Sequence, residues 1–247
     1  MDNGTKSLLN VLLSVLVPVI ILDNCSTEGP EFWKLGTTWA MAVALSLPLG
    51  CGVWLFIERG KVDPITLFGL LGTLLTAVVT IYANTGTAQS IQPDTPWWYA
   101  AKEALIALLL GGAVLVTARR KDSMLRLFVY SDSLFDIPRI EKAVQAAGKQ
   151  AEYNHTLWRA SLYTSLSLFI SSAANFLLAL HFLLPVLQHP ADKQVLEYNY
   201  AVSSMTWWGY LVIGVPLLIT LIAVMRFLIR KLSAISGLSS DDVLLTR

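Results

Sequence analysis

The sequence predicts an all-α, polytopic membrane protein with six transmembrane helices. Of its 247 residues, 55% are hydrophobic and only 14% are charged, whereas soluble domains carry about 25% charged residues. The apolar residues form long continuous runs instead of alternating with polar ones, which favours membrane-spanning helices over a β-barrel. Each run can cross about 30 Å of hydrocarbon at about 1.5 Å per residue. The runs are 7–22, 36–57, 64–83, 97–118, 157–187 and 203–229.

These runs differ in length and in proline content. The first is the shortest, and we interpret it as a retained helix because no small-x-small cleavage site of a signal peptide follows it. The fifth is longer than a span needs, so it tilts or extends beyond the bilayer before Pro185. Pro18, Pro48 and Pro216 lie within spans, where proline can interrupt the hydrogen-bond ladder. Helices 1–3 and 4–6 would have opposite orientations, as in inverted-repeat transporters, although the halves show no residue match.

Basic residues predict which side of the membrane each end of the chain occupies. Lys6 near the N-terminus, the 58–63 turn, the 119–156 segment and the C-terminal side together hold 14 basic residues, whereas the opposite loops contain only Lys34 and Lys193. Positively charged loops mark the cytoplasmic side, so we expect both termini in the cytoplasm. The expected organisation is helices 1–4 over 1–118, a cytoplasmic connector over 119–156, helices 5–6 over 157–230 and a cytoplasmic tail over 231–247.

The 119–156 connector begins with a basic cluster, Arg119-Arg120-Lys121, which would lie at anionic lipid headgroups. Further along, Asp136 fits an N-cap and Pro138 a first-turn position of a short helix that ends near Gly148. This helix is amphipathic, and it lies on the membrane surface or on the inner face of the bundle. The alternative is a solvated connector with a weak apolar stripe. The residues of the apolar face are Ile137, Ile140, Val144 and Ala147.

Three of the predicted helices carry a stripe of polar or small residues at helical spacing. One interpretation is helix packing, in which small residues allow close approach and hydroxyl or amide groups bond across helices. The other is that the stripes line a polar cavity and contain binding residues. Both interpretations place the stripes inside the bundle. The candidate binding residues are Asn10 in the first helix, Thr73 and Thr76 in the third, and Ser172 and Asn175 in the fifth, which share their face with Ser161 and Ser165.

Lys102 and Glu103 are adjacent charges inside the fourth apolar run, about 9 Å below its outer end. The lysine can snorkel to the outer headgroups past Trp98, or it can form an ion pair with another helix, for example with Asp23. In the functional interpretation, Lys102 and Glu103 form a binding or proton-coupling site, because buried carboxylates can titrate near neutral pH. Adjacent side chains point about 100° apart on a helix, so the two need not pair with each other.

The sequence contains no catalytic constellation that we can identify. The histidines and cysteines have no metal-ligand spacing. The chain also has no phosphate loop, no Gly-x-Ser-x-Gly elbow and no His-Glu-x-x-His motif. We therefore expect neither enzymatic activity nor a cofactor. Nucleic-acid binding is not expected either, because membrane topology already explains the basic cluster.

The run from Ile65 through Arg126 contains Trp97-Trp98 and an early lysine, Lys102, in the fourth predicted helix. With this run as its central part, the chain resembles the intracellular septation protein A family of bacterial inner-membrane proteins. The connector and the first outer loop are longer here, so the chain looks closer to an uncharacterised sister family of six-span proteins. The resemblance implies an envelope-related, multi-pass protein of the bacterial inner membrane, and it transfers no catalytic residue. Further similar positions are Val17-Pro18-Val19-Ile20, Leu115-Val116, Leu125, Trp158, Ala174-Asn175-Phe176 and Trp207-Trp208.

Two functions follow as hypotheses. The first is a small membrane-embedded binding or transport protein for an anionic solute or lipid, with a polar cavity near Lys102 and Glu103. The alternative is an envelope-related structural or scaffolding protein that holds partners through its helix faces and the 119–156 segment. Membrane lipids are expected partners in both cases. The sequence leaves open whether the chain forms a homo-oligomer or binds envelope proteins.

Overall fold

The computed structural model describes residues 17–25, 31–35, 90–120, 123–131 and 134–245, together with scattered helical residues between 39 and 83. Over these residues every regular element is a helix and no strand forms. This confirms the all-α fold class. The predicted runs 7–22, 36–57 and 64–83 lie largely outside the described residues, so the six-span architecture and its topology stay a prediction.

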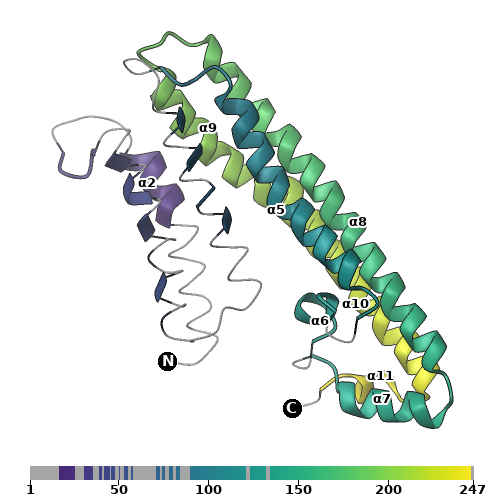
Figure 1. Cartoon of the computed structure of the whole chain (residues 1–247). Coiled ribbons are helices and arrows are strands. Elements are labelled where there is room, and N and C mark those ends of the chain that lie inside the picture. The colour runs from purple at the N-terminus through teal and green to yellow at the C-terminus, as the bar shows by residue number, and fades with distance from the viewer. Residues whose placement is uncertain are drawn as a thin grey trace. The chain divides into compact units, whose positions relative to one another are not determined.

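In the described part of the chain, three helical segments are long and apolar enough to cross a membrane (Figure 1). The first is α5, Thr95–Thr117. The second joins α8, Gln150–Leu183, to the 3-10 turn η2, Leu184–Gln188. The third joins α9, Gln194–Gly209, through the π turn η3, Tyr210–Gly214, to α10, Val215–Ser236. Length and composition therefore identify these segments as membrane-spanning candidates.

The helices that contain the fifth and sixth apolar runs, 157–187 and 203–229, extend beyond those runs. α8 already begins at Gln150, so residues 150–156 of the predicted connector are helical. The segment of α9 and α10 likewise begins before and ends after the predicted run 203–229. α10 ends where Gly237 adopts a left-handed φ of 73° and donates its N–H to the Ser233 carbonyl at 2.9 Å. Apolar periodicity marks the part of a helix in hydrocarbon and not its polar extensions, which explains the difference.

The π turn η3 ends at Gly214, two residues before Pro216. Proline lacks an N–H donor, and its ring crowds the carbonyl four residues earlier, here that of Val212. The hydrogen-bond ladder widens at this point, as it does in other π turns within α-helices. The prediction that Pro216 interrupts its span is therefore confirmed.

The chain divides into two compact units. Unit 1 comprises Met1–Ile106 and Ala174–Tyr210, and unit 2 comprises Ala107–Ala173 and Leu211–Arg247. In unit 1, α2, Val17–Cys25, lies beside α9. In the core of this unit, the rings of Tyr99 of α5 and Tyr198 of α9 pack edge to face, with centroids 6.1 Å apart. Small residues in this core allow the helices to approach closely. Its buried residues include Ala100, Ala179, Ala201, Val202 and Met205.

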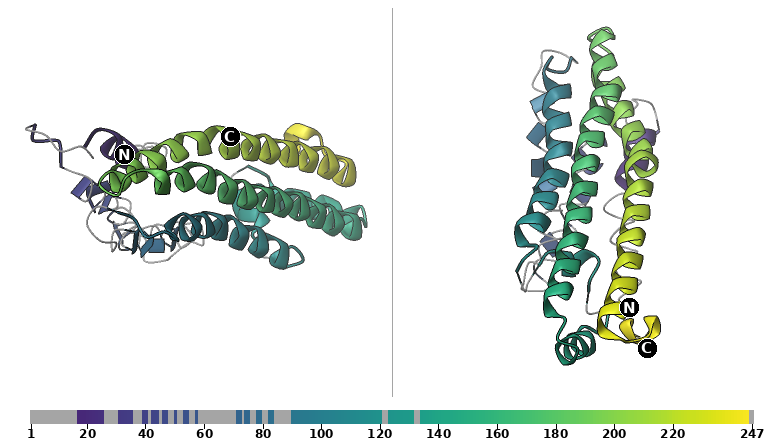
Figure 2. Two further views of the ribbon diagram at one scale, coloured as in Figure 1. Left: turned by 90° about the horizontal axis from the view of Figure 1, so that it is seen from above. Right: turned by 90° about the vertical axis from the view of Figure 1, so that its right-hand side faces the viewer.

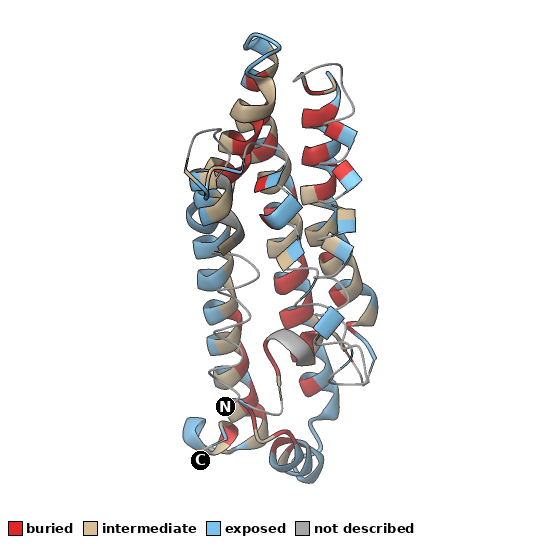
Figure 3. Ribbon diagram, turned by 90° about the vertical axis from the view of Figure 1, so that its left-hand side faces the viewer, coloured by how far each residue is buried: buried red, intermediate tan, exposed pale blue. Residues whose placement is uncertain are grey.

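Unit 2 adds three short helices to the long ones. These are α6, Leu125–Phe128, α7, Ile137–Ala146, and α11, Ser240–Val243. Within this unit α7 and α11 contact each other and α10 (Figures 1 and 2). The buried residues of α10 recur on one helix face (Figure 3), as a packed amphipathic end requires. They are Val224, Leu228, Leu232 and Ile235.

The short connector helix predicted from the sequence is α7. The Asp136 carboxylate caps it by accepting the Arg139 N–H at 3.1 Å, and Pro138 lies in the first turn. Gly148 follows with a left-handed φ of 67°. The predicted apolar face is confirmed at its first three positions and wrong at Ala147, which is exposed because α7 ends before it. The face packs into the same core as the end of α10, so α7 docks on the protein instead of being a solvated connector.

The C-terminal segment is fastened to the start of α7. Phe135 and Leu244 form an isolated antiparallel bridge, and the Asp136 N–H donates to the Val243 carbonyl at 3.1 Å. The Arg139 guanidinium pairs with the Asp242 carboxylate at 2.9 Å. Val243 is fully buried. The segment predicted as a cytoplasmic tail therefore contributes Leu232, Ile235 and Val243 to the core of unit 2.

Candidate functional site

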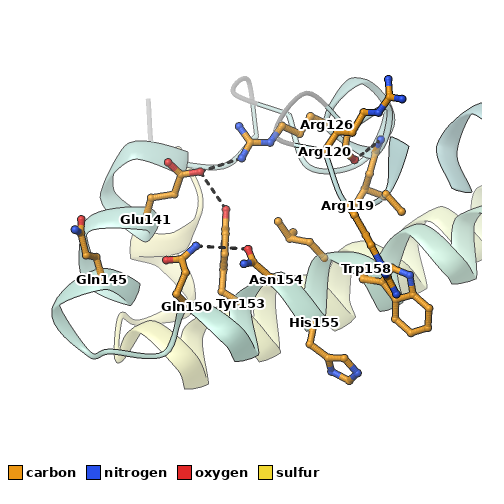
Figure 4. Close-up of a pocket in the computed structure, with 14 residues that line it drawn as sticks. Arg119, Arg120, Arg126, Glu141, Gln145, Gln150, Tyr153, Asn154, His155 and Trp158 are labelled. Carbon is orange, nitrogen blue, oxygen red and sulfur yellow. Dashed lines mark hydrogen bonds and ion pairs between the residues drawn. The ribbon is translucent and has the colours of Figure 1, made fainter. Parts of the chain in front are cut away.

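A large polar cavity lies in unit 2 where the end of α5, α6, α7 and the start of α8 meet. It has a volume of about 980 Å³, which is at the upper end of the range for small-molecule sites. We call it the arginine pocket (Figure 4). Its lining consists of Ala118, Arg119, Arg120, Ser123, Leu125, Arg126, Glu141, Gln145, Gln150, Tyr153, Asn154, His155, Leu157 and Trp158.

The Thr117 hydroxyl lies at the end of α5, directly before the segment that carries Arg119 and Arg120. The Thr117 hydroxyl donates to the Ala113 carbonyl at 2.7 Å and accepts the Met124 N–H at 3.0 Å. One side chain therefore links the last turn of α5 to Met124 at the start of α6. Arg119 and Arg120 follow the end of α5 and line the pocket.

A hydrogen-bonded network forms one wall of the arginine pocket. The Arg126 guanidinium pairs with Glu141 Oε1 at 2.9 Å, and the Tyr153 hydroxyl donates to the same oxygen at 3.3 Å (Figure 4). The Tyr130 and Tyr153 hydroxyls lie 3.3 Å apart. The Arg126 guanidinium carbon also lies 5.8 Å from the centroid of the Tyr130 ring. Because α6, α7 and α8 each contribute a side chain, the network holds these elements in register.

Burial and the neighbouring carboxylate shift the pKa of Arg126, in the wall of the pocket, in opposite directions. Burial lowers the pKa of Arg126, but the hydrogen bond and charge of Glu141 outweigh it, so the pKa lies above its ordinary value. Burial raises the pKa of Tyr130 well above its ordinary value. Arg126 is thus always cationic and Tyr130 always neutral at physiological pH.

The arginine pocket has an excess of positive charge. Arg119, Arg120 and Arg126 line it, and Glu141 is the one carboxylate among its described lining residues. Arg126 is paired with Glu141, whereas the ion pairs of the described residues include neither Arg119 nor Arg120. Both of these side chains are exposed. They are therefore available to an anion, and arginine is the side chain that best matches the oxygens of phosphate or carboxylate groups.

The remaining lining adds neutral polar groups and an aromatic surface. Gln150 donates to the Asn154 side chain at 3.5 Å. The rings of His155 and Trp158 stack, with centroids 6.0 Å apart. Among the described residues, no group of three or more His, Cys, Asp or Glu side chains could hold a metal ion. The chemistry that this lining supports is the binding of an anion by charge and hydrogen bonds.

Lys102 and Glu103, the leading residues of the sequence analysis, lie in unit 1 and pair with each other. Lys102 Nζ is 2.6 Å from Glu103 Oε1, and the side chains are 7% and 30% exposed. Lys102 Nζ also lies 3.9 Å from the centroid of the Tyr99 ring. The lysine is therefore held inside the unit and does not snorkel. Its charge is balanced by the neighbouring carboxylate, which reduces its attraction for another anion. The structure does not describe the side chain of Asp23, so its predicted ion pair with Lys102 stays a prediction.

The other predicted binding residues do not come together at one described site. Ser172 is buried in α8 within unit 2, and Asn175 is half-buried in α8 within unit 1. Asn10, Thr73 and Thr76 lie outside the described residues. Their assignment as binding residues stays a prediction.

The serine stripe of α8 contributes to helix packing in unit 2. Ser161 and Ser165 are buried, and the Ser165 hydroxyl donates to the Gly111 carbonyl of α5 at 2.9 Å. A Cβ atom on Gly111 would lie 2.7 Å from Cε1 of Phe169 and 3.2 Å from Cβ of Leu168. The close approach of the two helices therefore depends on this glycine. At Ser165 the helix-packing interpretation of the stripe is confirmed.

The basic cluster at 119–121 is evident in the sequence, but the pocket beside it is not. Arg126, Glu141 and Tyr153 are far apart in the sequence, and nothing in their spacing indicates contact. One signal was available, because α7 has its apolar face at Ile137, Ile140 and Val144. Docking that face on the protein turns Glu141 toward the neighbouring turn.

Comparison with known proteins gives no relative for this chain. No protein-family model, no curated protein and no solved structure matches it.

Proposed function

We propose that the chain is a membrane-embedded protein that binds a water-soluble, phosphate-bearing anion in the arginine pocket. The observation that carries the proposal is a cavity of about 980 Å³ in which exposed Arg119 and Arg120 have no carboxylate partner among the described residues. The arginines match phosphate oxygens, and the glutamine and asparagine side chains of the lining suit the polar remainder of such a solute.

This proposal keeps the anionic ligand inferred from the sequence and moves its site. Lys102 is paired with Glu103, so a second anion near it would compete with an existing ion pair. The positive-inside rule places the 119–121 turn at the cytoplasmic side, where phosphorylated solutes are abundant. If the protein also moves the bound solute across the membrane, it is a transporter with the same binding site. The resemblance to the septation protein A family implies the bacterial inner membrane, and the distribution of basic residues implies that both termini are in the cytoplasm.

Isothermal titration calorimetry on the full chain in detergent tests the proposal, with sn-glycerol 3-phosphate as the probe. The wild-type chain is expected to bind it. Replacing Arg119→Gln and Arg120→Gln together is expected to weaken binding by at least about tenfold, because each charge-assisted contact contributes about 1.5 kcal/mol or more. Lys142→Gln is the matched control, because it removes a positive charge from an exposed position of α7 outside the pocket. Equal affinities of all variants, or no binding by the wild type, contradict the proposal.

The second candidate is the envelope-related scaffold, which the docked α7 supports. The apolar face of α7 is buried, while Lys142 and Lys149 stay exposed and offer a charged surface to a partner. Deleting 136–150 would remove part of the core of unit 2 and would not separate scaffolding from folding. Lys142→Glu with Lys149→Glu is the cleaner test. Loss of co-purifying envelope proteins with unchanged glycerol phosphate affinity favours the scaffold.

A further inference from the structure

A second cavity of unit 2 lies in a different environment from the arginine pocket. It is a groove of about 440 Å³ between α8 and α10, two helices that lie side by side within this unit (Figure 2). Its lining from α8 includes Leu166 and Ile170, and its lining from α10 includes Leu217 and Val224. We call this groove the lipid trough. Leu166 and Ile170 are largely exposed, and both belong to a membrane-spanning candidate, so they are positioned to face lipid.

The side chain of Arg159 lies at one end of the lipid trough and is held in place by its neighbours. Arg159 Nη2 donates to the Tyr163 hydroxyl at 2.9 Å. Its guanidinium carbon lies 5.9 Å from the ring centroids of Tyr163 and Phe227. Those two rings line the trough and meet edge to face at 5.6 Å. Two aromatic contacts and one hydrogen bond therefore fix the guanidinium at the mouth of an apolar groove.

The Arg159 charge is not balanced inside the described part of the chain. The ion pairs recorded there do not include this residue. Its guanidinium has five N–H donors, of which the Tyr163 hydroxyl uses one. The other donors are free to hold a negatively charged group that approaches from the exposed side.

The length of the trough matches one leaflet of a bilayer. From Arg159 to Ile170 the α8 backbone rises about 16 Å, and the α10 backbone rises as much from Phe227 to Pro216. Half of a hydrocarbon core of about 30 Å is about 15 Å. A group bound at Arg159 would therefore lie at headgroup level, with the trough below it reaching to the bilayer midplane.

We propose that the lipid trough binds one anionic phospholipid, with its phosphate on Arg159 and an acyl chain between α8 and α10. An apolar groove in a lipid-facing surface loses dispersion contacts unless hydrocarbon fills it. Basic sites between transmembrane helices at the cytoplasmic side recognise anionic headgroups. A second copy of the chain is a poorer occupant, because a two-fold contact would bring another Arg159 toward the first.

Native mass spectrometry of the full chain in detergent tests this proposal, with phosphatidylglycerol and phosphatidylcholine as probes. The wild type is expected to bind phosphatidylglycerol more tightly than phosphatidylcholine. Arg159→Gln is expected to weaken phosphatidylglycerol binding about tenfold and to remove that preference. Ala223→Phe fills the trough and is expected to weaken the binding of both lipids, because Ala223 lines it.

Two control variants separate the trough from general attraction to the membrane. Arg230→Gln removes a positive charge from α10 outside the trough, and Leu218→Phe adds volume at an exposed α10 position outside it. Neither is expected to change phosphatidylglycerol affinity more than about twofold. An effect of Arg230→Gln as large as that of Arg159→Gln overturns the proposal. So does unchanged lipid binding in Ala223→Phe, or the appearance of a dimer in the wild type that Ala223→Phe abolishes. The trough and the arginine pocket share no residue, so either proposal can fail alone.

Discussion

The Arg126 guanidinium and the Glu141 carboxylate form an ion pair of 2.9 Å that joins α6 to α7. The two side chains are 32% and 46% exposed, so the pair itself contributes only about 0.2–1 kcal/mol to the free energy of unfolding. If an anion binds in the arginine pocket as proposed, the negative charge of Glu141 opposes it. Arg126 holds Glu141 at the wall of the pocket.

Glu141→Gln is therefore expected to raise the affinity for glycerol 3-phosphate by about two- to fivefold, because it removes one negative charge from a solvent-screened cavity. Titration calorimetry measures the change, and Glu152→Gln, an exposed position of α8 outside the pocket lining, is the control. A lower affinity in Glu141→Gln would mean that the wall must stay intact for binding and that Glu141 does not act through its charge.

Gly111 and Gly112 provide a matched pair for the contact of α5 with α8 in unit 2. A Cβ atom on Gly111 would meet the Phe169 ring at 2.7 Å, whereas one on Gly112 would meet nothing within 4 Å. Gly111→Ala is expected to lower the free energy of unfolding by about 1–3 kcal/mol through overpacking. Gly112→Ala is expected to be neutral or to stabilise by up to about 1 kcal/mol, since alanine favours helix. Thermal unfolding in detergent measures both, and equal effects would contradict the packing described.

The Lys102–Glu103 pair predicts an asymmetric double-mutant cycle. Glu103→Gln leaves a buried ammonium without its carboxylate and is expected to destabilise unit 1 by about 2 kcal/mol, below the about 3–5 kcal/mol of a fully buried pair because Glu103 is 30% exposed. Adding Lys102→Met should restore most of that loss, since no charge then remains buried. Chemical denaturation of the three variants gives the coupling. Independent, additive effects would show that the ion pair is not the main partner of Lys102.

The contact of the C-terminal segment with α7 is expected to weaken in acid, because it includes the Asp242 carboxylate. The Ser239 hydroxyl first, and the Arg139 charge after it, hold the pKa of Asp242 below its ordinary value of 3.8. A lowered folded-state pKa stabilises the segment above pH 3.8, and this contribution is lost as the pH falls through the lowered pKa. The protection of residues 239–245 from hydrogen exchange, taken relative to the unfolded chain at the same pH, should therefore fall in that window. Asp242→Asn is expected to show low protection already at neutral pH, whereas Asp241→Asn should behave like the wild type.

Much of this fold could be predicted from the sequence. Continuous apolar runs predicted the spans at α5, α8 and α10, and the capping residues Asp136 and Gly148 predicted α7. The polar start of α8 was missed because apolar periodicity stops where hydrocarbon stops. Pro216 predicted a break in the ladder, and the structure forms it as a π turn.

The candidate site was less predictable, because it depends on contacts between distant residues. Lys102 and Glu103 are charges within an apolar run, which predicts a functional site, yet the two side chains form an ion pair with each other. Arg119 and Arg120 had an ordinary topological explanation, and their functional interest appears only when α7 and the start of α8 enclose a cavity beside them.

The most direct test of anion binding in the arginine pocket is chemical footprinting of arginine side chains with phenylglyoxal, read by peptide mass spectrometry on the full chain. Glycerol 3-phosphate is expected to protect Arg119 and Arg120 from modification while leaving Arg139 as reactive as before, because Arg139 is exposed outside the pocket. Unchanged modification of Arg119 and Arg120 at saturating glycerol 3-phosphate, or equal protection of Arg139, would contradict the account.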